Sequence, residues 1–199
     1  MKRLPARSAA VLTTVLVSAL ASTIVPSGTA AAASDTKTSS IAVDPATSIQ
    51  MQVSANCDSA QARCFFTTTA SLLTPGGPTG FPGDTWARQT VTLRSSNRDV
   101  WQQAWYSAPS GNPRELKGAN HENVLSKMYR SLSDVELSIT YFGGGPIQRF
   151  TSDGDSVPTQ WQNGLPATDA DFIACSQIQV VYSGVNLTTP TACAQTRFG

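Results

Sequence analysis

Few side chains in this sequence have the types and spacing of a catalytic centre. His121 is the only histidine, so a histidine-dependent mechanism would have to use it. Four aspartates form two close pairs: Asp153 with Asp155, and Asp169 with Asp171. Carboxylates so close in one loop are more often turn formers than a glycosidase pair, whose members come from separate elements. We therefore favour a protein that is not an enzyme. The alternative is a secreted hydrolase whose site is built from loop carboxylates or from His121.

Known phosphate and hydrolase motifs are missing. The sequence has no GxSxG elbow, no HExxH pair and no glycine-rich loop followed by Lys-Ser or Lys-Thr. With one histidine and no CxxC spacing, the ligand set for a zinc site is also missing. We therefore expect neither a metal nor a cofactor.

The first 33 residues have the three parts of a secretory signal peptide. A basic start at residues 2–7 precedes an uncharged, mostly apolar stretch at 9–25, and small residues follow at 28–33. Cleavage is expected after Ala32 or Ala33. Because several Ser and Thr residues interrupt the apolar stretch, stable membrane insertion is not expected. The protein is predicted to be secreted and extracellular.

Cleavage after Ala33 leaves 166 of the 199 residues, enough for one domain. This part has 11 basic and 13 acidic residues, a net charge of −2. Nucleic acid is not expected as a partner, since phosphate binding needs clustered positive charge. The polar, aperiodic residues 34–47 predict a flexible leader, and residues 48–199 predict a single disulfide-bonded, β-rich domain.

Four cysteines lie in the mature part of the chain: Cys57, Cys64, Cys175 and Cys193. An even number in an exported protein predicts two disulfides. Of the three possible pairings we favour Cys57–Cys64 with Cys175–Cys193, because each bond closes a short, turn-rich loop.

The loop at residues 74–84 contains three prolines and four glycines, so neither a helix nor an inner strand is expected there. Two interpretations compete for Phe81, which lies inside it. Phe81 either packs against the core, or anchors a preorganised binding loop whose docking costs little entropy. On the second interpretation the candidate binding residues are Pro78, Phe81, Pro82 and, in a later loop, Trp161.

Tryptophan provides another candidate site. Residues 99–106 predict a strand in which Trp101 and Trp105 share one face. These two residues and Trp161 would either be buried or form a platform that stacks on sugar rings. The third functional alternative is therefore a carbohydrate-binding module.

The elements that must position these groups are mainly strands. Alternating apolar residues predict strands at 49–55, 64–73, 86–94, 135–142 and 178–182. Residues 152–169 predict a loop by composition. Val124, Leu125, Met128 and Tyr129 recur at helical spacing and predict an amphipathic helix, with Asn120 as its N-cap. The expected fold is mainly β, with α+β as the alternative: an antiparallel, sandwich-like core with one amphipathic helix.

Together these features favour a secreted, non-enzymatic binding protein. It would present the rigid Pro/Gly-rich loop to an extracellular protein or a cell-envelope component, with enzyme inhibition as one form of that function. The oligomeric state does not follow from the sequence.

Overall fold

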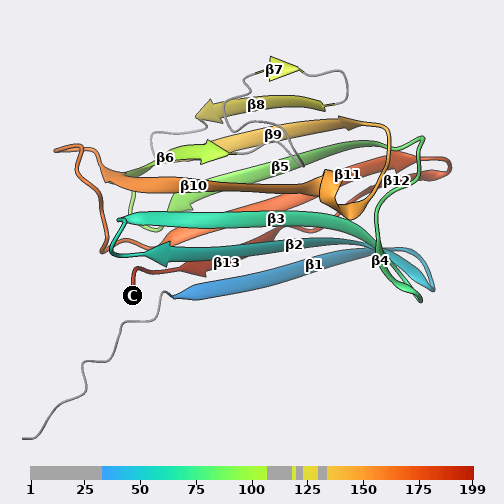
Figure 1. The fold of residues 1–199 in the computed structure, drawn as a ribbon, viewed down its shortest axis with the longest axis horizontal. Coiled ribbons are helices and arrows are strands. Elements are labelled where there is room, and N and C mark those ends of the chain that lie inside the picture. The colour runs from blue at the N-terminus through green and yellow to red at the C-terminus, as the bar shows by residue number, and fades with distance from the viewer. Residues whose placement is uncertain (1–32, 107–117, 120–122, 130–133) are drawn as a thin grey trace, which may run out of the picture.

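Two antiparallel sheets packed face to face make up the protein in the computed structural model, which describes residues 33–106, 118–119, 123–129 and 134–199 (Figure 1). The mainly antiparallel, sandwich-like fold expected from the sequence is confirmed. Among the described residues, no helix has the length and apolar character needed to cross a membrane.

The first sheet has the order β1-β2-β3-β10-β6, with β4 paired to β3. Its strands are β1 (Ser34–Asp44), β2 (Thr47–Asp58), β3 (Arg63–Thr74), β4 (Gly77–Thr79), β6 (Val100–Tyr106) and β10 (Thr151–Gln160). The second sheet has the order β12-β11-β5-β9-β8-β7, with β13 paired to β11. Its strands are β5 (Trp86–Ser95), β7 (Gly118–Ala119), β8 (Asn123–Tyr129), β9 (Val135–Phe142), β11 (Phe172–Tyr182), β12 (Val185–Thr188) and β13 (Ala192–Thr196). A short 3-10 helix, η1 (Ile147–Phe150), precedes β10.

The core lies between the sheets because alternate residues of each inner strand point inward. From β2 the buried set includes Ile49, Met51 and Val53, and from β9 it includes Leu137 and Ile139. These side chains belong to one continuous cluster that draws on both sheets.

A buried polar network crosses this core. Gln89 on β5 is fully buried and donates from Nε2 to Thr68 Oγ1 at 2.7 Å and to Ser176 Oγ at 3.3 Å. Its Oε1 accepts a hydrogen bond of 2.7 Å from the Tyr141 hydroxyl. Burial raises the pKa of Tyr141, so the hydroxyl remains the donor. Because a buried amide needs its hydrogen-bond partners, the network favours one alignment of the two sheets relative to each other.

Both predicted disulfides are confirmed. Cys57–Cys64 joins β2 to β3, and Cys175–Cys193 joins β11 to β13; the Cα atoms are 4.0 Å apart in each pair. Each bond links two neighbouring strands at directly paired positions. Two disulfides are typical of proteins in an oxidising, extracellular environment.

The predicted amphipathic helix is wrong. Asn123–Tyr129 forms strand β8, which pairs antiparallel with β9 from Asn123↔Tyr141 to Tyr129↔Val135. A lone short helix gains little from its own backbone hydrogen bonds, whereas the edge of β9 provides partners along the whole segment. Tertiary pairing therefore overrides the helical spacing. The expected N-cap, Asn120, and the only histidine, His121, lie outside the described residues.

The flexible leader predicted at residues 34–47 is also wrong, since Ser34–Asp44 forms β1. This strand pairs with β2 from Ser34↔Asn56 to Asp44↔Thr47. Its polar composition suits a strand at the end of a sheet, where most side chains face water.

Residues 152–169 were expected to form a loop, but Thr151–Gln160 is strand β10, an inner strand of the first sheet that lies between β3 and β6. The sequence SDGDSVP reads as a turn because Gly, Asp and Pro are rare in strands. Glycine is required at position 154 because there is no space for a side chain, not because the chain turns there. A Cβ on it would lie 2.4 Å from the Trp105 carbonyl oxygen and 2.7 Å from the Phe66 ring.

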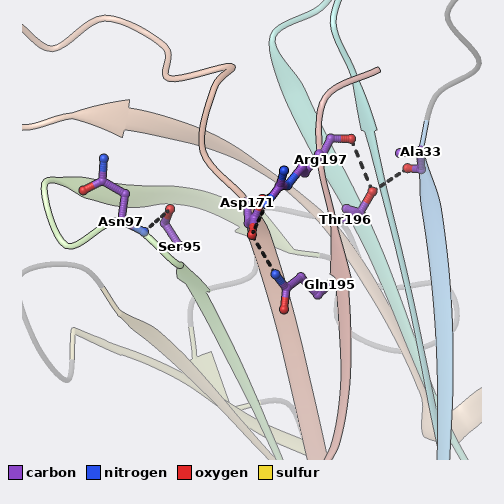
Figure 2. Close-up of polar contacts among 7 residues, drawn as sticks. All are labelled: Ala33, Ser95, Asn97, Asp171, Gln195, Thr196 and Arg197. Atoms are coloured by element: carbon purple, nitrogen blue, oxygen red, sulfur yellow. Dashed lines mark hydrogen bonds and ion pairs between the residues drawn. The ribbon is translucent and has the colours of Figure 1, made fainter.

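The two ends of the described chain close one side of the sandwich, where β1 of the first sheet lies beside β13 of the second (Figure 1). The Gln195 backbone N–H donates to Asp35 Oδ2 at 3.0 Å, and the Ser39 hydroxyl donates to the Pro190 carbonyl at 2.5 Å. Figure 2 shows how Asp171 holds the last residues through Arg197 and Gln195.

Candidate functional site

The outer face of the first sheet carries exposed aromatic side chains on β6. Along this strand Val100, Gln102 and Ala104 are buried, while Trp101, Gln103 and Trp105 point outward. Trp105 is 43% exposed. Among the described residues β6 pairs only with β10, so it is the last strand of its sheet. The sequence therefore placed both tryptophans correctly on one face.

Trp161 joins them from the loop after β10. Its ring centroid lies 5.8 Å from that of Trp101, with the planes inclined by 32°. The loop is ordered by three backbone hydrogen bonds of 2.9 Å: Trp161 N–H to Asp99 O, Gly164 N–H to Gln160 O, and Gln160 N–H to Leu165 O. Despite this stacking, Trp161 remains 48% exposed. Trp101, Trp105 and Trp161 are called the tryptophan surface below.

An ion pair holds one end of the tryptophan surface. Arg63 Nη1 on β3 lies 2.7 Å from Asp155 Oδ1 on β10, and its guanidinium carbon lies 5.1 Å from the centroid of the Trp105 ring. Asp155 is the residue paired directly with Trp105 across the sheet. A guanidinium over an indole face is attractive, so Arg63 holds one face of Trp105 while the side chain stays 43% exposed.

The outer face around Trp105 also carries hydroxyl, amide and carboxylate groups, beside the partly exposed Phe65 and Val157. The polar outward positions on β6, β3 and β10 are Gln103, Thr67, Thr69, Thr151 and Asp153. Thr69 and Thr151 are joined across the strands by a 3.3 Å hydrogen bond between their hydroxyls. An exposed aromatic strip beside many hydrogen-bonding groups can bind a ligand that has both flat apolar faces and hydroxyls.

The four binding residues chosen from the sequence do not come together. Pro78 lies in β4 opposite Leu73, near the start of β10, whereas Trp161 follows the end of that strand. Ten residues of strand separate the two by about 30 Å. Phe81 is only 4% exposed and packs edge-on against Phe150, with centroids 4.7 Å apart.

The Pro/Gly-rich loop instead pairs with the turn after β9. Phe81 N–H donates to Gly145 O at 3.1 Å, and Gly145 N–H donates to Phe81 O at 3.0 Å. The backbones approach so closely that a Cβ on Gly80 would lie 1.8 Å from the Gly145 oxygen. The interpretation in which Phe81 packs against the core is therefore the one observed.

The carboxylates considered for a hydrolase are dispersed. Asp155 binds Arg63, and Asp171 binds Arg197. The Arg197 guanidinium, aided by Gln195, holds the pKa of Asp171 below its usual value. Asp169 lies elsewhere, in a hollow of about 170 Å³ lined by Asn97, Asp99, Val100, Gln160, Gln162 and Asp169. His121 lies outside the described residues.

A larger hollow of about 340 Å³ lies on the outer face of the second sheet. It is lined by Thr90, Thr92, Arg94, Asp134, Cys175, Ser176, Gln177, Thr191 and Cys193. The disulfide Cys175–Cys193 forms part of its wall, and the Thr191 hydroxyl donates to Gln177 Oε1 at 2.9 Å. Neither hollow contains a cluster of three or more acidic, histidine or cysteine groups arranged for a metal within the described ranges.

Two contacts at the tryptophan surface were not found from the sequence: the Arg63–Asp155 ion pair beside Trp105 and the contact between Trp161 and Trp101. Arg63 and Asp155 are 92 residues apart, and no local pattern connects them. Trp161 was identified as a candidate, but its contact with Trp101 depends on the path of β10 through a segment expected to be a loop.

Comparisons with known proteins leave the function open. No protein-family model matches the chain, and no curated protein matches it. Among solved structures, it is similar to the NetB toxin of Clostridium perfringens in the membrane-inserted form, at 9% sequence identity. The similarity covers 82% of this chain and 91% of that one, with a TM-score of 0.22. At this TM-score the similarity supports no conclusion about fold or activity.

Proposed function

We propose that this is a secreted, non-enzymatic protein that binds an extracellular or cell-envelope glycan through the tryptophan surface. The observation that carries the proposal is the exposure of two indoles: Trp105, 43% exposed on the outer face of β6, and Trp161, 48% exposed in the loop after β10, where it lies against Trp101 of β6. Secretion rests on the signal-peptide pattern of residues 1–33 and agrees with the two disulfides.

The chemistry of the surface suits a sugar polymer. A sugar ring has a face of C–H groups that can lie on an indole and a rim of hydroxyls that need hydrogen-bond partners. Gln103, two residues from Trp105 on β6, and Thr67, on β3 of the same face, are exposed and can supply such partners. The indoles are held in place before binding by Arg63 and by the Trp101–Trp161 contact, so little conformational entropy is lost on binding.

The same structure weakens the case for a docking loop at residues 75–82. Its only aromatic residue, Phe81, is buried and supports the core. We therefore transfer the binding role from this loop to β6 and to the loop that follows β10. Of the four carboxylates considered for a hydrolase, Asp155 and Asp171 are held in ion pairs with arginines, and only Asp169 lines one of the hollows described above, together with Asp99. We therefore favour binding over hydrolysis.

The test is retention of the mature protein by insoluble cellulose, chitin, xylan and starch in sedimentation assays. Trp105→Ala and Trp161→Ala should each lower the retained fraction at least about tenfold, since stacking on an aromatic ring contributes on the order of 1–2 kcal/mol. Phe142→Ala is the matched control, because Phe142 is 49% exposed but lies on the second sheet.

Circular dichroism and thermal unfolding confirm that each variant is folded. Equal retention of the wild type and both tryptophan variants would contradict the proposed surface. A wild type that none of these polymers retains would contradict glycan binding for the polymers tried.

A further inference from the structure

The two disulfides differ in position: one lies inside the sandwich and the other on its outer surface. Cys57 and Cys64 are fully buried and belong to the core cluster between the sheets. Cys175 is 7% exposed and Cys193 is half-buried, and both line the hollow of about 340 Å³ on the outer face of the second sheet. A reagent in solution can therefore approach the second bond in the folded protein, whereas the packed core encloses the first.

The strands joined by the buried disulfide have many other contacts. β2 and β3 pair along nearly their whole length. Their inward side chains include Ile49, Met51 and Phe66, which are large and almost completely buried. Because burial of such side chains stabilises a strand pair strongly, β2 and β3 are expected to stay together without the covalent bond.

The strand β13 has fewer contacts of this kind. It has five residues, and among the described strands it pairs only with β11. Its inward side chains are Ala192, Ala194 and Thr196, which bury little apolar surface. The residues after β13 are held by Asp171 and by Phe198, which packs against the core. The disulfide lies in the middle of this short strand, so it is a main anchor between β13 and β11.

We infer that Cys175–Cys193 is a reducible, regulatory disulfide: a dithiol reductant opens it while the buried disulfide stays intact, and the opening loosens β13 from β11. The change extends to β1, because the Gln195 N–H of β13 donates to Asp35 Oδ2 of β1. This inference goes beyond the proposed function and does not depend on glycan binding.

The reaction is thiol–disulfide exchange. One thiolate of the reductant attacks the sulfur of Cys193, the more exposed partner, and the Cys175 sulfur leaves as a thiolate. The second thiolate of the reductant then attacks the reductant's own sulfur in the mixed disulfide and releases Cys193. The protein disulfide gains two electrons, the reductant becomes a disulfide, and the protons of its two thiols end on the two cysteines.

The experiment is timed reduction of the folded mature protein by dithiothreitol, followed by rapid alkylation and peptide mass spectrometry. Cys175 and Cys193 should be alkylated together, at a rate at least about tenfold above that of Cys57 and Cys64, because attack requires access to a sulfur. Hydrogen exchange of the reduced protein should become at least about tenfold faster in β13 and stay unchanged in β2 and β3. Reoxidation with oxidised glutathione should restore the slow exchange.

Double variants separate the bond from the reagent. Cys175→Ser combined with Cys193→Ser should show the fast exchange in β13 without any reductant. The matched control combines Cys57→Ser with Cys64→Ser, and dithiothreitol should reduce its remaining disulfide at the wild-type rate. If that control does not fold, the alkylation rates of the wild type decide the selectivity.

Three results would overturn the inference. Equal rates for the two disulfides, or faster reduction of the buried one, would contradict selective opening. Resistance of both bonds until the whole protein unfolds would contradict access to the outer bond. Selective reduction with unchanged hydrogen exchange in β13 would contradict the regulatory role. Glycan retention enters none of these measurements, so the proposed function stands or falls separately.

Discussion

Two loops of this protein each combine an aromatic residue with glycine and proline, but one buries its aromatic side chain and the other exposes it. In the loop at residues 75–83, Phe81 points inward and is 4% exposed. In the loop at residues 161–166, Trp161 points outward and is 48% exposed. The first loop supports the core, and the second displays a side chain that the core does not use.

The difference follows from what each backbone pairs with. The Phe81 loop binds the turn at residues 143–145 through hydrogen bonds in both directions, so its side chain is covered and meets Phe150. The Trp161 loop closes mainly on its own strand, through Gly164 and Leu165, with one bond from Trp161 N–H to Asp99 O, and its indole lies against Trp101. Backbone pairing in both directions covers Phe81, whereas the one bond to Asp99 leaves Trp161 half exposed.

The largest expected effect tests this comparison directly. Phe81→Ala should lower the free energy of unfolding by about 3–5 kcal/mol, because it leaves a cavity beside Phe150. Trp161→Ala should lower it by about 1 kcal/mol or less, since only a half-exposed stacking contact is lost. Urea unfolding measures both values. Similar losses for the two variants would show that the loops do not differ in structural role.

A second pair of variants tests the close backbone contact at the Phe81 loop. A Cβ on Gly144 would lie 1.7 Å from the Pro82 oxygen, whereas a Cβ on Gly83 would have nothing within 4 Å. Gly144→Ala should therefore lower the free energy of unfolding by about 3 kcal/mol, through forced displacement of the loop. Gly83→Ala is the matched control and should change it by less than about 0.5 kcal/mol. An unaffected Gly144→Ala variant would mean that the loop is not held against the turn.

The sequence could not distinguish the two loops, because the composition around Phe81 and Trp161 is alike and their partners are distant in the chain. What could be predicted was local. The Cys57–Cys64 and Cys175–Cys193 bonds close short loops, and alternation alone defines the strand at 135–142. Trp101 and Trp105 share a face for the same reason.

The failed predictions depended on the pairing of strands. β8 is a strand because β9 offers it an edge, although its apolar residues have helical spacing. β10 is an inner strand despite Gly154 and Pro158, since β3 and β6 pair with it on either side. The Arg63–Asp155 ion pair could not be predicted, because these two residues become neighbours only through the register of β10 in its sheet. Each case requires knowledge of which strands are neighbours.

The pH dependence of stability provides a third comparison of the two ends of the sandwich. The end near Trp161 is held through Asp171, whose backbone carbonyl accepts from Ser96 N–H and whose side chain binds Arg197. Arg197 lowers the pKa of Asp171 below its usual value of 3.8. A carboxyl with a lowered folded pKa contributes stability above the unfolded pKa and loses it as the pH falls through the folded pKa. The Phe81 end is joined by backbone hydrogen bonds that do not titrate.

Asp171→Asn should accordingly be less stable than the wild type at pH 6, and the difference should shrink below about pH 4. Urea unfolding across this pH range measures it. Asp99→Asn is the matched control, because Asp99 lies at the same end but makes no ion pair within the described part of the chain. A difference that stays constant with pH would show that the carboxylate charge of Asp171 does not hold this end.

The smallest effect concerns Ala33, the first described residue, which lies at the same end of the sandwich. The Ala33 carbonyl accepts a hydrogen bond from the Thr196 hydroxyl at 2.5 Å (Figure 2) and one from Cys57 N–H at 3.4 Å. On our proposal that a signal peptide is removed, cleavage after Ala32 keeps this carbonyl, whereas cleavage after Ala33 removes it. We expect a chain that begins at Ala33, and the intact mass of the exported protein distinguishes the two. Thr196→Val should then lower the free energy of unfolding by about 0.5–1.5 kcal/mol. A mature chain that begins at Ser34 and tolerates Thr196→Val without loss would show that this end is held by Asp171 and the strands alone.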